Sequence, residues 1–184
     1  MPNAILDPTG RANVEAPKPP EELVLAARKA GAAGLRVGLL NNTKHNAALL
    51  LAEIGELLTG EHAARVTLAE TKPNFAAPAP ADLIERFASQ CDVVITGVGD
   101  CGSCSASAVA DGILFERAGV PAAVICSDAF VVTANAMAHM RGAPDYHFVV
   151  TEHPVAVLDA EQVRQRAKRL APEVVSLVTE RVSQ

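Results

Sequence analysis

Short apolar segments alternate with helical patterns along this chain, and no other feature of the sequence restricts the fold as much. The apolar segments are rich in Val, Ile and Leu and do not alternate strictly with polar residues, as a sheet covered on both faces requires. They span residues 35–40, 65–69, 92–98, 122–126 and 147–151. The helical patterns span residues 45–58, 81–89, 105–118, 132–140 and 161–182. This order predicts a doubly wound α/β domain of about five mostly parallel strands flanked by helices, with right-handed crossovers.

The N-terminal region does not follow this pattern. Five prolines lie within the first 20 residues, which predicts an extended arm over residues 1–20, followed by one flavodoxin-like or Rossmann-like domain over residues 21–184. A proline and two glutamates at residues 20–22 are typical of a helix N-terminus, and they predict a short helix that reaches Gly31. Residues 72–80 are rich in Pro and Ala and predict a surface loop after the second strand.

The composition excludes several classes of function. The formal net charge is −5, which argues against nucleic-acid or anionic-membrane binding. Aromatic residues make up 3% of the chain and tryptophan is absent, so base-stacking platforms are not expected. No apolar run reaches the roughly 18–20 residues of a membrane span, and the first residues do not resemble a signal peptide. Four cysteines are too few for a disulfide scaffold. We therefore predict a cytoplasmic protein.

Polar residues gather at the ends of three predicted strands. They occupy residues 41–46 after the first strand, 97–105 after the third and 151–154 after the fifth. In open α/β sheets, ligands bind at the carboxyl ends of the strands, where the strand order reverses. We therefore expect these three segments to meet at one edge of the sheet.

Cys101 and Cys104 lie three residues apart in a Gly- and Ser-rich turn between a predicted strand and a predicted helix. A helix N-terminus stabilises a thiolate and lowers the pKa of a cysteine below its free value of about 8.5. The thiolate is a nucleophile, and a second thiol one turn away can resolve the adduct. The N–H groups of the turn can hold a carboxylate or an oxyanion. Ser103 or Ser105 is expected to cap the helix.

Two other interpretations of the cysteine pair remain open. Both thiols can be small fillers of a buried region, as cysteine often is. A zinc site would need two more ligands, for which His153 and Asp100 are the candidates, and the sequence has no second C-x-x-C and no H-x-x-x-H. No bound metal or cofactor is therefore predicted.

The stretch from residue 94 to 111, VITGVGDCGSCSASAVAD, resembles the (U/C)GSC signature of the UGSC (seleno)protein family. The segments ILDPTG at 5–10, NTKHN at 42–46, ERAGVP at 116–121 and His153-Pro154 agree with it, so the resemblance covers nearly the whole chain. In that family the first motif position can be selenocysteine, which implies that Cys101 is the reactive chalcogen and Cys104 its partner.

The family is described as related to the selenoprotein B subunit of glycine, betaine and sarcosine reductases. That relation implies thiol attack on an activated small substrate. Two features depart from the pattern: His45 stands where Pro is expected, and the chain lacks the extra domains and the pyruvoyl chemistry of the large reductases. The resemblance therefore identifies the site rather than the substrate.

Several polar residues at the strand ends complete the candidate site. His153 is a candidate general base, Lys44 a candidate ligand for a substrate carboxylate, and Asp100 either a general acid or a helix cap. The predicted catalytic residues are Cys101, Cys104 and His153. The predicted substrate-binding residues are Asn42, Thr43, Lys44, Asp100, Gly102, Ser103, Ser105 and Asp128.

Five further residues carry weaker expectations. Asp111 lies two turns into the helix after the motif and is a candidate for burial near the site. Glu116 and Arg117 are expected to face solvent. Cys126 is expected in the core, with an active third thiol as the alternative, and Cys91 is expected to be structural.

We predict a thiol-dependent enzyme that acts on a small, anionic, electrophilic substrate, with reductive cleavage as the leading reaction. A redox-neutral lyase, hydratase or isomerase step is the first alternative, because a cysteine adduct need not end in a disulfide. A redox-switch or metal-binding subunit is the non-enzyme alternative. An external thiol or a thioredoxin-like protein is the expected reductant, and a homodimer or a related subunit remains open.

Overall fold

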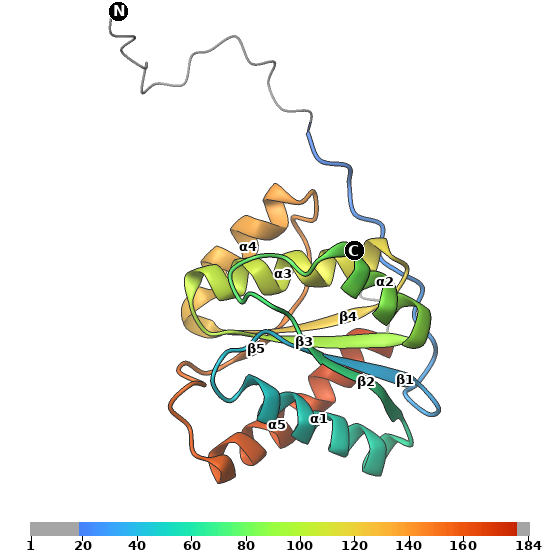
Figure 1. Ribbon diagram of the computed structural model, residues 1–184, viewed down its shortest axis with the longest axis vertical. Coiled ribbons are helices and arrows are strands. Elements are labelled where there is room, and N and C mark those ends of the chain that lie inside the picture. Colours follow the sequence, from blue (N-terminus) through green and yellow to red (C-terminus); the bar gives the residue numbers. More distant parts are fainter. Residues whose placement is uncertain (1–18, 180–184) are drawn as a thin grey trace, which may run out of the picture.

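The computed structural model describes residues 19–179, and within them five strands form one sheet in which all neighbouring strands are parallel (Figure 1). The strands are β1 (Arg36–Asn41), β2 (Arg65–Thr71), β3 (Val93–Gly99), β4 (Ala122–Ser127) and β5 (Val149–Thr151). Their order, β2-β1-β3-β4-β5, is that of a flavodoxin-like fold. The predicted doubly wound sheet is therefore confirmed. The predicted arm lies outside the described residues up to residue 18, as do the last residues of the predicted C-terminal helix.

Helices cover both faces of the sheet (Figure 1). One layer contains α1 (Ala47–His62) and α5 (Ala160–Thr179), and the other contains α2 (Ala81–Gln90), α3 (Gly102–Arg117) and α4 (Val131–Met140). A short 3₁₀ turn, η1 (Asp128–Phe130), precedes α4. Every residue of β3 and β4 is buried, because these central strands have helices on both sides. The strand order reverses between β1 and β3, which places the candidate ligand crevice at their carboxyl ends.

The edge strand β2 differs from the continuous apolar strand that we predicted at residues 65–69. Its residues alternate between exposed and half-buried. A strand at the edge of a sheet has a neighbour on one side only, and the helices cover it less completely. The prediction of a strand is confirmed, but the prediction that both of its faces are covered is wrong.

The predicted helix at residues 20–31 is absent from the structure. Residues 19–30 have no helical assignment. The N–H of Leu23 donates to the carbonyl of Gly142 at 2.9 Å, and the N–H of Ala26 donates to the carboxylate of Glu116 at 2.8 Å. These amides bind distant parts of the chain instead of their own helix, so tertiary contacts override the local helical signal.

Glu116 is buried, with 2% of its surface exposed, although we expected it to face solvent. Its carboxylate accepts hydrogen bonds from the guanidinium of Arg28 and from the N–H of Ala122. A buried carboxylate needs such partners, because burial without them is costly. The expectation was wrong for Glu116, whereas Arg117 is exposed as expected.

Lys72 is fully buried, although it begins the predicted surface loop at residues 72–80. Its Nζ donates to the Ala77 carbonyl, to the Ser107 hydroxyl and to the Asp111 carboxylate. Asp111 is fully buried, as proposed from the sequence, and it also accepts from the N–H of Ala79. It lies ten residues after Cys101, about 15 Å along the helix axis. The cluster therefore fastens the loop to α3 and lies away from the motif, so the expectation that Asp111 lies near the site is wrong.

Candidate active site

The three polar strand ends meet at one edge of the sheet, as expected. The Asn42 side chain accepts from the N–H of Val98 and donates to the carbonyl of the same residue, both at 3.0 Å. Asn46 donates to the carbonyl of Val155 at 3.0 Å. The Asp100 carboxylate accepts from the N–H of Val155 at 3.1 Å. Side-chain to backbone hydrogen bonds thus join the segments after β1, β3 and β5.

The motif turn places a cysteine at the start of α3. Cys101 is the N-cap residue, and its Sγ accepts from the N–H of Cys104 at 3.2 Å. The hydroxyl of Ser105 donates to the carbonyl of Cys101 at 2.9 Å. Ser103 is exposed, and its hydroxyl lies 3.7 Å from the Cys101 sulfur. The prediction that Ser103 or Ser105 caps this helix is therefore wrong, because the cysteine sulfur occupies that position.

Cys101 and Cys104 are joined as a disulfide within the first turn of α3. Their surroundings differ: Cys101 is partly exposed, whereas only 1% of Cys104 is exposed. A ligand can therefore reach the first sulfur much more easily than the second. The close approach of α3 to the sheet depends on Gly99, where a Cβ would lie 2.7 Å from the Cα of Ser105 and 2.6 Å from the sulfur of Cys126. No larger residue fits there without displacing the helix.

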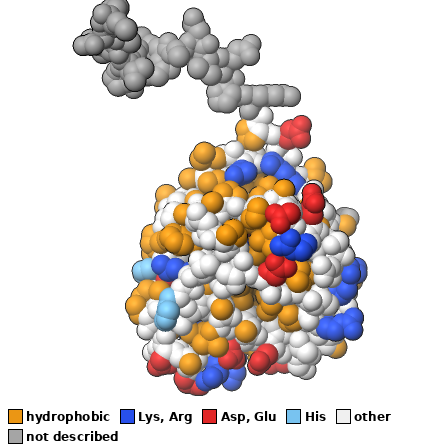
Figure 2. All heavy atoms as spheres, viewed as in Figure 1, with side chains coloured by type: hydrophobic (Ala, Val, Ile, Leu, Met, Phe, Trp, Pro, Cys, Tyr) orange, Lys and Arg blue, Asp and Glu red, His pale blue; other side chains and the backbone are white. Residues whose placement is uncertain are grey.

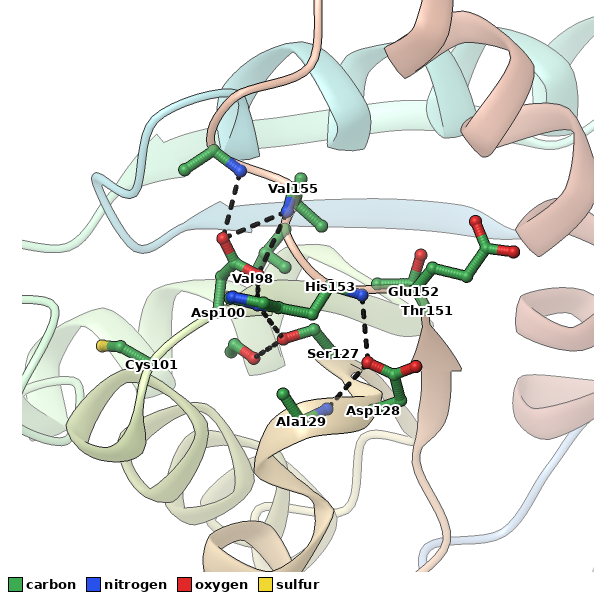
Figure 3. A network of polar contacts seen from close by, with 12 residues as sticks. Val98, Asp100, Cys101, Ser127, Asp128, Ala129, Thr151, Glu152, His153 and Val155 are labelled. Carbon is green, nitrogen blue, oxygen red and sulfur yellow. Dashed lines mark hydrogen bonds and ion pairs between the residues drawn. The ribbon is translucent and has the colours of Figure 1, made fainter.

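Asp100 and His153 form a second polar unit at the same edge (Figure 3). The Oδ1 of Asp100 lies 2.9 Å from the Nδ1 of His153. Only 4% of Asp100 is exposed, whereas 38% of the His153 side chain is exposed. Burial raises the pKa of the Asp100 carboxyl, but hydrogen bonds from the N–H groups of Val155 and Ala156 outweigh it and hold that pKa below its ordinary value.

The carboxylate of Asp100 fixes the histidine ring in one orientation. An ionised carboxylate beside Nδ1 keeps the proton on that nitrogen. No described residue bonds to Nε2, which leaves it to exchange protons with a ligand. Because Asp100 holds no proton at neutral pH and does not cap the helix, its geometry favours a positioning role over the general-acid or cap role considered from the sequence.

The family model of the UGSC family matches residues 4–180. The chain belongs to the UGSC family. None of the curated proteins matches. Among solved structures, the flavodoxin-like domain of a Synechococcus sp. protein matches with a TM-score of 0.41 and 19% sequence identity, covering 76% of this chain and 90% of that domain. The relation to the selenoprotein B subunit stays a prediction.

The segment after β1 holds three of the predicted substrate-binding residues, which differ in their burial and in their hydrogen-bond partners. Asn42 is fully buried and its amide is used by Val98, so it holds the motif turn in place. Thr43 is exposed, with a positive φ of 68°. Lys44 is half-buried, and its ammonium group has no partner among residues 19–179. Lys44 is thus the cation of this segment that remains available to an anion.

Asp128 lies in η1 and holds the backbone of the His153 turn. Its carboxylate accepts from the N–H of His153 at 3.0 Å. The ring of Phe130, in the same turn, meets the His153 ring edge to face at a centroid distance of 5.3 Å. Figure 3 shows the Cys101 side chain pointing away from His153, so the two predicted catalytic groups do not touch in this disulfide state.

Sequence reasoning missed two groups that hold the site together. The N–H groups of Val155 and Ala156 clamp Asp100, and no side-chain pattern could have revealed them because they are backbone atoms. Arg166, on α5, donates to the carbonyl of Glu152 at 2.6 Å. It lies among other charged residues of an amphipathic helix, so the sequence gives no signal that distinguishes it.

Two features are absent from the part of the chain that the structure describes. Among residues 19–179 there is no group of three His, Cys, Asp or Glu side chains that could hold a metal ion. No helix within this range is both long and apolar enough to cross a bilayer. On the face drawn in Figure 2, Lys and Arg side chains lie among Asp and Glu side chains rather than in one basic patch.

Lowering the pH is expected to destabilise the fold through Asp100. Its folded-state pKa lies below the unfolded value of about 3.9, so its contribution to stability is full above that value and is lost as the pH falls through the folded pKa. Asp92, hydrogen-bonded to Arg36, acts in the same direction because its pKa is also lowered. The free energy of unfolding in urea should be level from pH 7 to 5 and fall below about pH 4. Asp100→Asn should reduce that fall; an unchanged profile would contradict the assignment.

Proposed function

We propose that this UGSC protein is a thiol-dependent enzyme, most simply a reductase, in which Cys101 attacks a small anionic electrophile and Cys104 resolves the adduct. The observation that carries the proposal is the asymmetric cysteine pair at the start of α3, already joined as a disulfide, in which Cys101 is partly exposed and Cys104 is buried. A nucleophile must be reachable, whereas a resolving thiol needs access only to the first sulfur.

The reaction balances as a two-electron reduction. The Cys101 thiolate attacks the substrate R–X, forms an S–R bond and expels X with the bonding electrons. Cys104 then attacks the Cys101 sulfur as a thiolate, the disulfide forms, and R leaves with the electron pair as a thiolate or a stabilised carbanion. When the His153 ring carries protons on both nitrogens, it supplies the Nε2 proton to the leaving group and is left as the Nδ1–H tautomer. A dithiol reductant, such as a thioredoxin-like protein, returns two electrons to the pair.

The surroundings of Cys101 fit this role. The first N–H groups of α3 and the positive end of its dipole stabilise a thiolate in the position that Cys101 occupies. Lys44 and the free N–H groups of the turn can bind the anionic part of the substrate. A reducing cytoplasm would keep the pair in its active dithiol form. A homodimer or a related subunit remains compatible with this scheme.

A redox-neutral reaction is the second candidate, and one observation favours it. The Asp100–His153 pair forms a complete acid–base unit without any contact to the Cys101 sulfur. Such a pair can move protons in a lyase, hydratase or isomerase step, with the cysteine adduct returning to a thiol instead of a disulfide. In this case turnover would need no external reductant.

The proposal is tested first by the pH dependence of alkylation. The reduced protein is treated with iodoacetamide from pH 5 to 10, and the adducts are located by peptide mass analysis. We expect Cys101 to react first, with an apparent pKa well below about 8.5. A Cys101 that titrates at or above that value, or one that reacts no faster than Cys91, would contradict the proposal. Cys101→Ser serves as the control.

A second measurement separates the enzyme from a redox switch. The protein is incubated with small anionic electrophiles and dithiothreitol, and consumption of the electrophile is followed. Saturable turnover that disappears in Cys101→Ser supports the enzyme. Binding of a protein partner that changes with oxidation, without any turnover, supports the switch instead. Turnover that persists without reductant identifies the redox-neutral reaction.

A further inference from the structure

His153 lies in a turn that has little secondary structure to hold it. The preceding strand β5 has three residues and forms the edge of the sheet, and the next helix, α5, begins at Ala160. Such a segment is mobile by default unless side-chain contacts fasten it. Two contacts from other elements are described above: Asp128 accepts from the His153 N–H, and Asp100 contacts the His153 ring.

Arg166 fastens the same turn from the side of α5. Its Nη1 donates to the Thr151 hydroxyl at 2.7 Å and to the Glu152 carbonyl at 2.6 Å. Its Nη2 donates to the Glu152 carboxylate at 2.9 Å. All three acceptors belong to the two residues that directly precede His153. The guanidinium thus binds the backbone and both side chains immediately before the candidate proton donor.

Arg166 is buried at a free-energy cost, which indicates that its hydrogen bonds to Thr151 and Glu152 are needed. Its side chain is 9% exposed, and its Nε is buried without a hydrogen-bond partner. Leaving a buried donor unsatisfied is unfavourable, and proteins usually avoid it. The planar fork of an arginine reaches a carbonyl, a hydroxyl and a carboxylate at once, which a lysine ammonium on its flexible stem does not reproduce. The Arg166 guanidinium also pairs with the Glu152 carboxylate, and Nη2 of Arg169 lies 3.5 Å from the same carboxylate.

We infer that Arg166 is a positioning residue for His153: by holding Thr151 and Glu152 it keeps the Nδ1 of His153 against Asp100 and leaves Nε2 as the exchanging nitrogen. Two carboxylates contact the histidine: Asp100 after β3 contacts its ring, and Asp128 in η1 accepts from its backbone N–H. The Glu152 carboxylate in the same turn pairs with Arg166. Without Arg166 the turn loosens, the Asp100 contact lengthens and the Glu152 carboxylate is released. The catalytic consequence rests on the proposed function, whereas the tautomer of His153 does not.

The test is the ¹⁵N NMR spectrum of the His153 ring in the full chain. We expect the Nδ1–H tautomer in the natural protein and a shift toward a mixture of tautomers in Arg166→Gln. Arg166→Lys should be intermediate, because it restores the charge but not the fork. Arg164→Gln is the matched control on the same helix, since Arg164 pairs with Glu53 and Glu161 instead of the turn.

Two further variants keep the inference falsifiable if Arg166→Gln does not fold. Thr151→Val and Glu152→Ala each remove one side-chain acceptor, and the second removes an exposed carboxylate. Each should shift the tautomer in the same direction as Arg166→Gln. Where turnover is measurable, Arg166→Lys should lower kcat about tenfold or more with little change in KM. An unchanged His153 tautomer in all folded variants would overturn the inference, whatever the outcome for activity. If the tautomer shifts in the variants but the natural protein shows no turnover, the inference is supported and the proposed function is rejected.

Discussion

Replacing Cys104 with serine is expected to trap a covalent adduct on Cys101. The informative probe is 5,5′-dithiobis(2-nitrobenzoate), an anionic disulfide whose leaving group absorbs visible light. In the reduced natural protein, Cys101 displaces one nitrothiobenzoate and Cys104 displaces the second, so two equivalents are released and the disulfide re-forms. In Cys104→Ser one equivalent should be released, and intact mass should show the other half still attached to Cys101.

The matched control is Cys101→Ser, which leaves the buried Cys104 as the remaining motif thiol. With 1% of its surface exposed, Cys104 should react far more slowly, and any turnover should fall about a thousandfold or more. Cys91 and Cys126 are buried, and burial raises the pKa of Cys126 to about 12, so both should stay silent in the folded protein. An adduct on Cys104 in preference to Cys101 would reverse the assigned roles.

Replacing Lys72 with methionine should be among the most destabilising single changes away from the site. Removing one partner of a buried ion pair leaves an uncompensated group and costs about 3–5 kcal/mol. Burial raises the pKa of the Asp111 carboxyl even with Lys72 beside it, so this carboxyl is already hard to keep charged. Urea unfolding should show the loss, and the melting temperature should fall by roughly 10 °C.

The controls separate this cluster from ordinary surface pairs. Arg86→Ala breaks ion pairs with Glu70 and Asp82 in which the arginine is 45% exposed, and it should change the stability little because solvent screens exposed ion pairs. The double variant Lys72→Met/Asp111→Leu should recover much of the loss, because apolar residues of similar volume can replace a buried pair. A Lys72→Met protein as stable as Arg86→Ala would contradict the analysis.

The sequence was sufficient for the five strands and for the five helices that follow them within the described residues. Apolar segments at residues 92–98 and 122–126 became β3 and β4, each within one residue of its predicted bounds. A continuous apolar segment indicates a strand whose two faces are both covered by helices, and this burial is what stabilises a strand in a parallel sheet. The C-x-x-C turn was equally readable, since its glycines and its position before a helical pattern are local features.

Errors arose where a distant residue decided the outcome. Residues 20–31 carry a local helical signal, yet the carboxylate of Glu116 and the carbonyl of Gly142 take their amides. Lys72 and Glu116 have the composition of surface residues and are buried only because a partner lies opposite each of them. No local pattern encodes such a partner, because it comes from another element.

By itself, the sequence determined the layered α/β architecture, the family and the turn that bears the two cysteines, because these follow from periodicity and from short motifs. Only the tertiary structure decided which cysteine is more accessible, that Asp100 orients His153, and that Arg166 holds the two residues before His153. The physical reason is that hydrogen bonds and burial depend on atoms brought together from separate strands and helices, and their distances arise only when the sheet has formed.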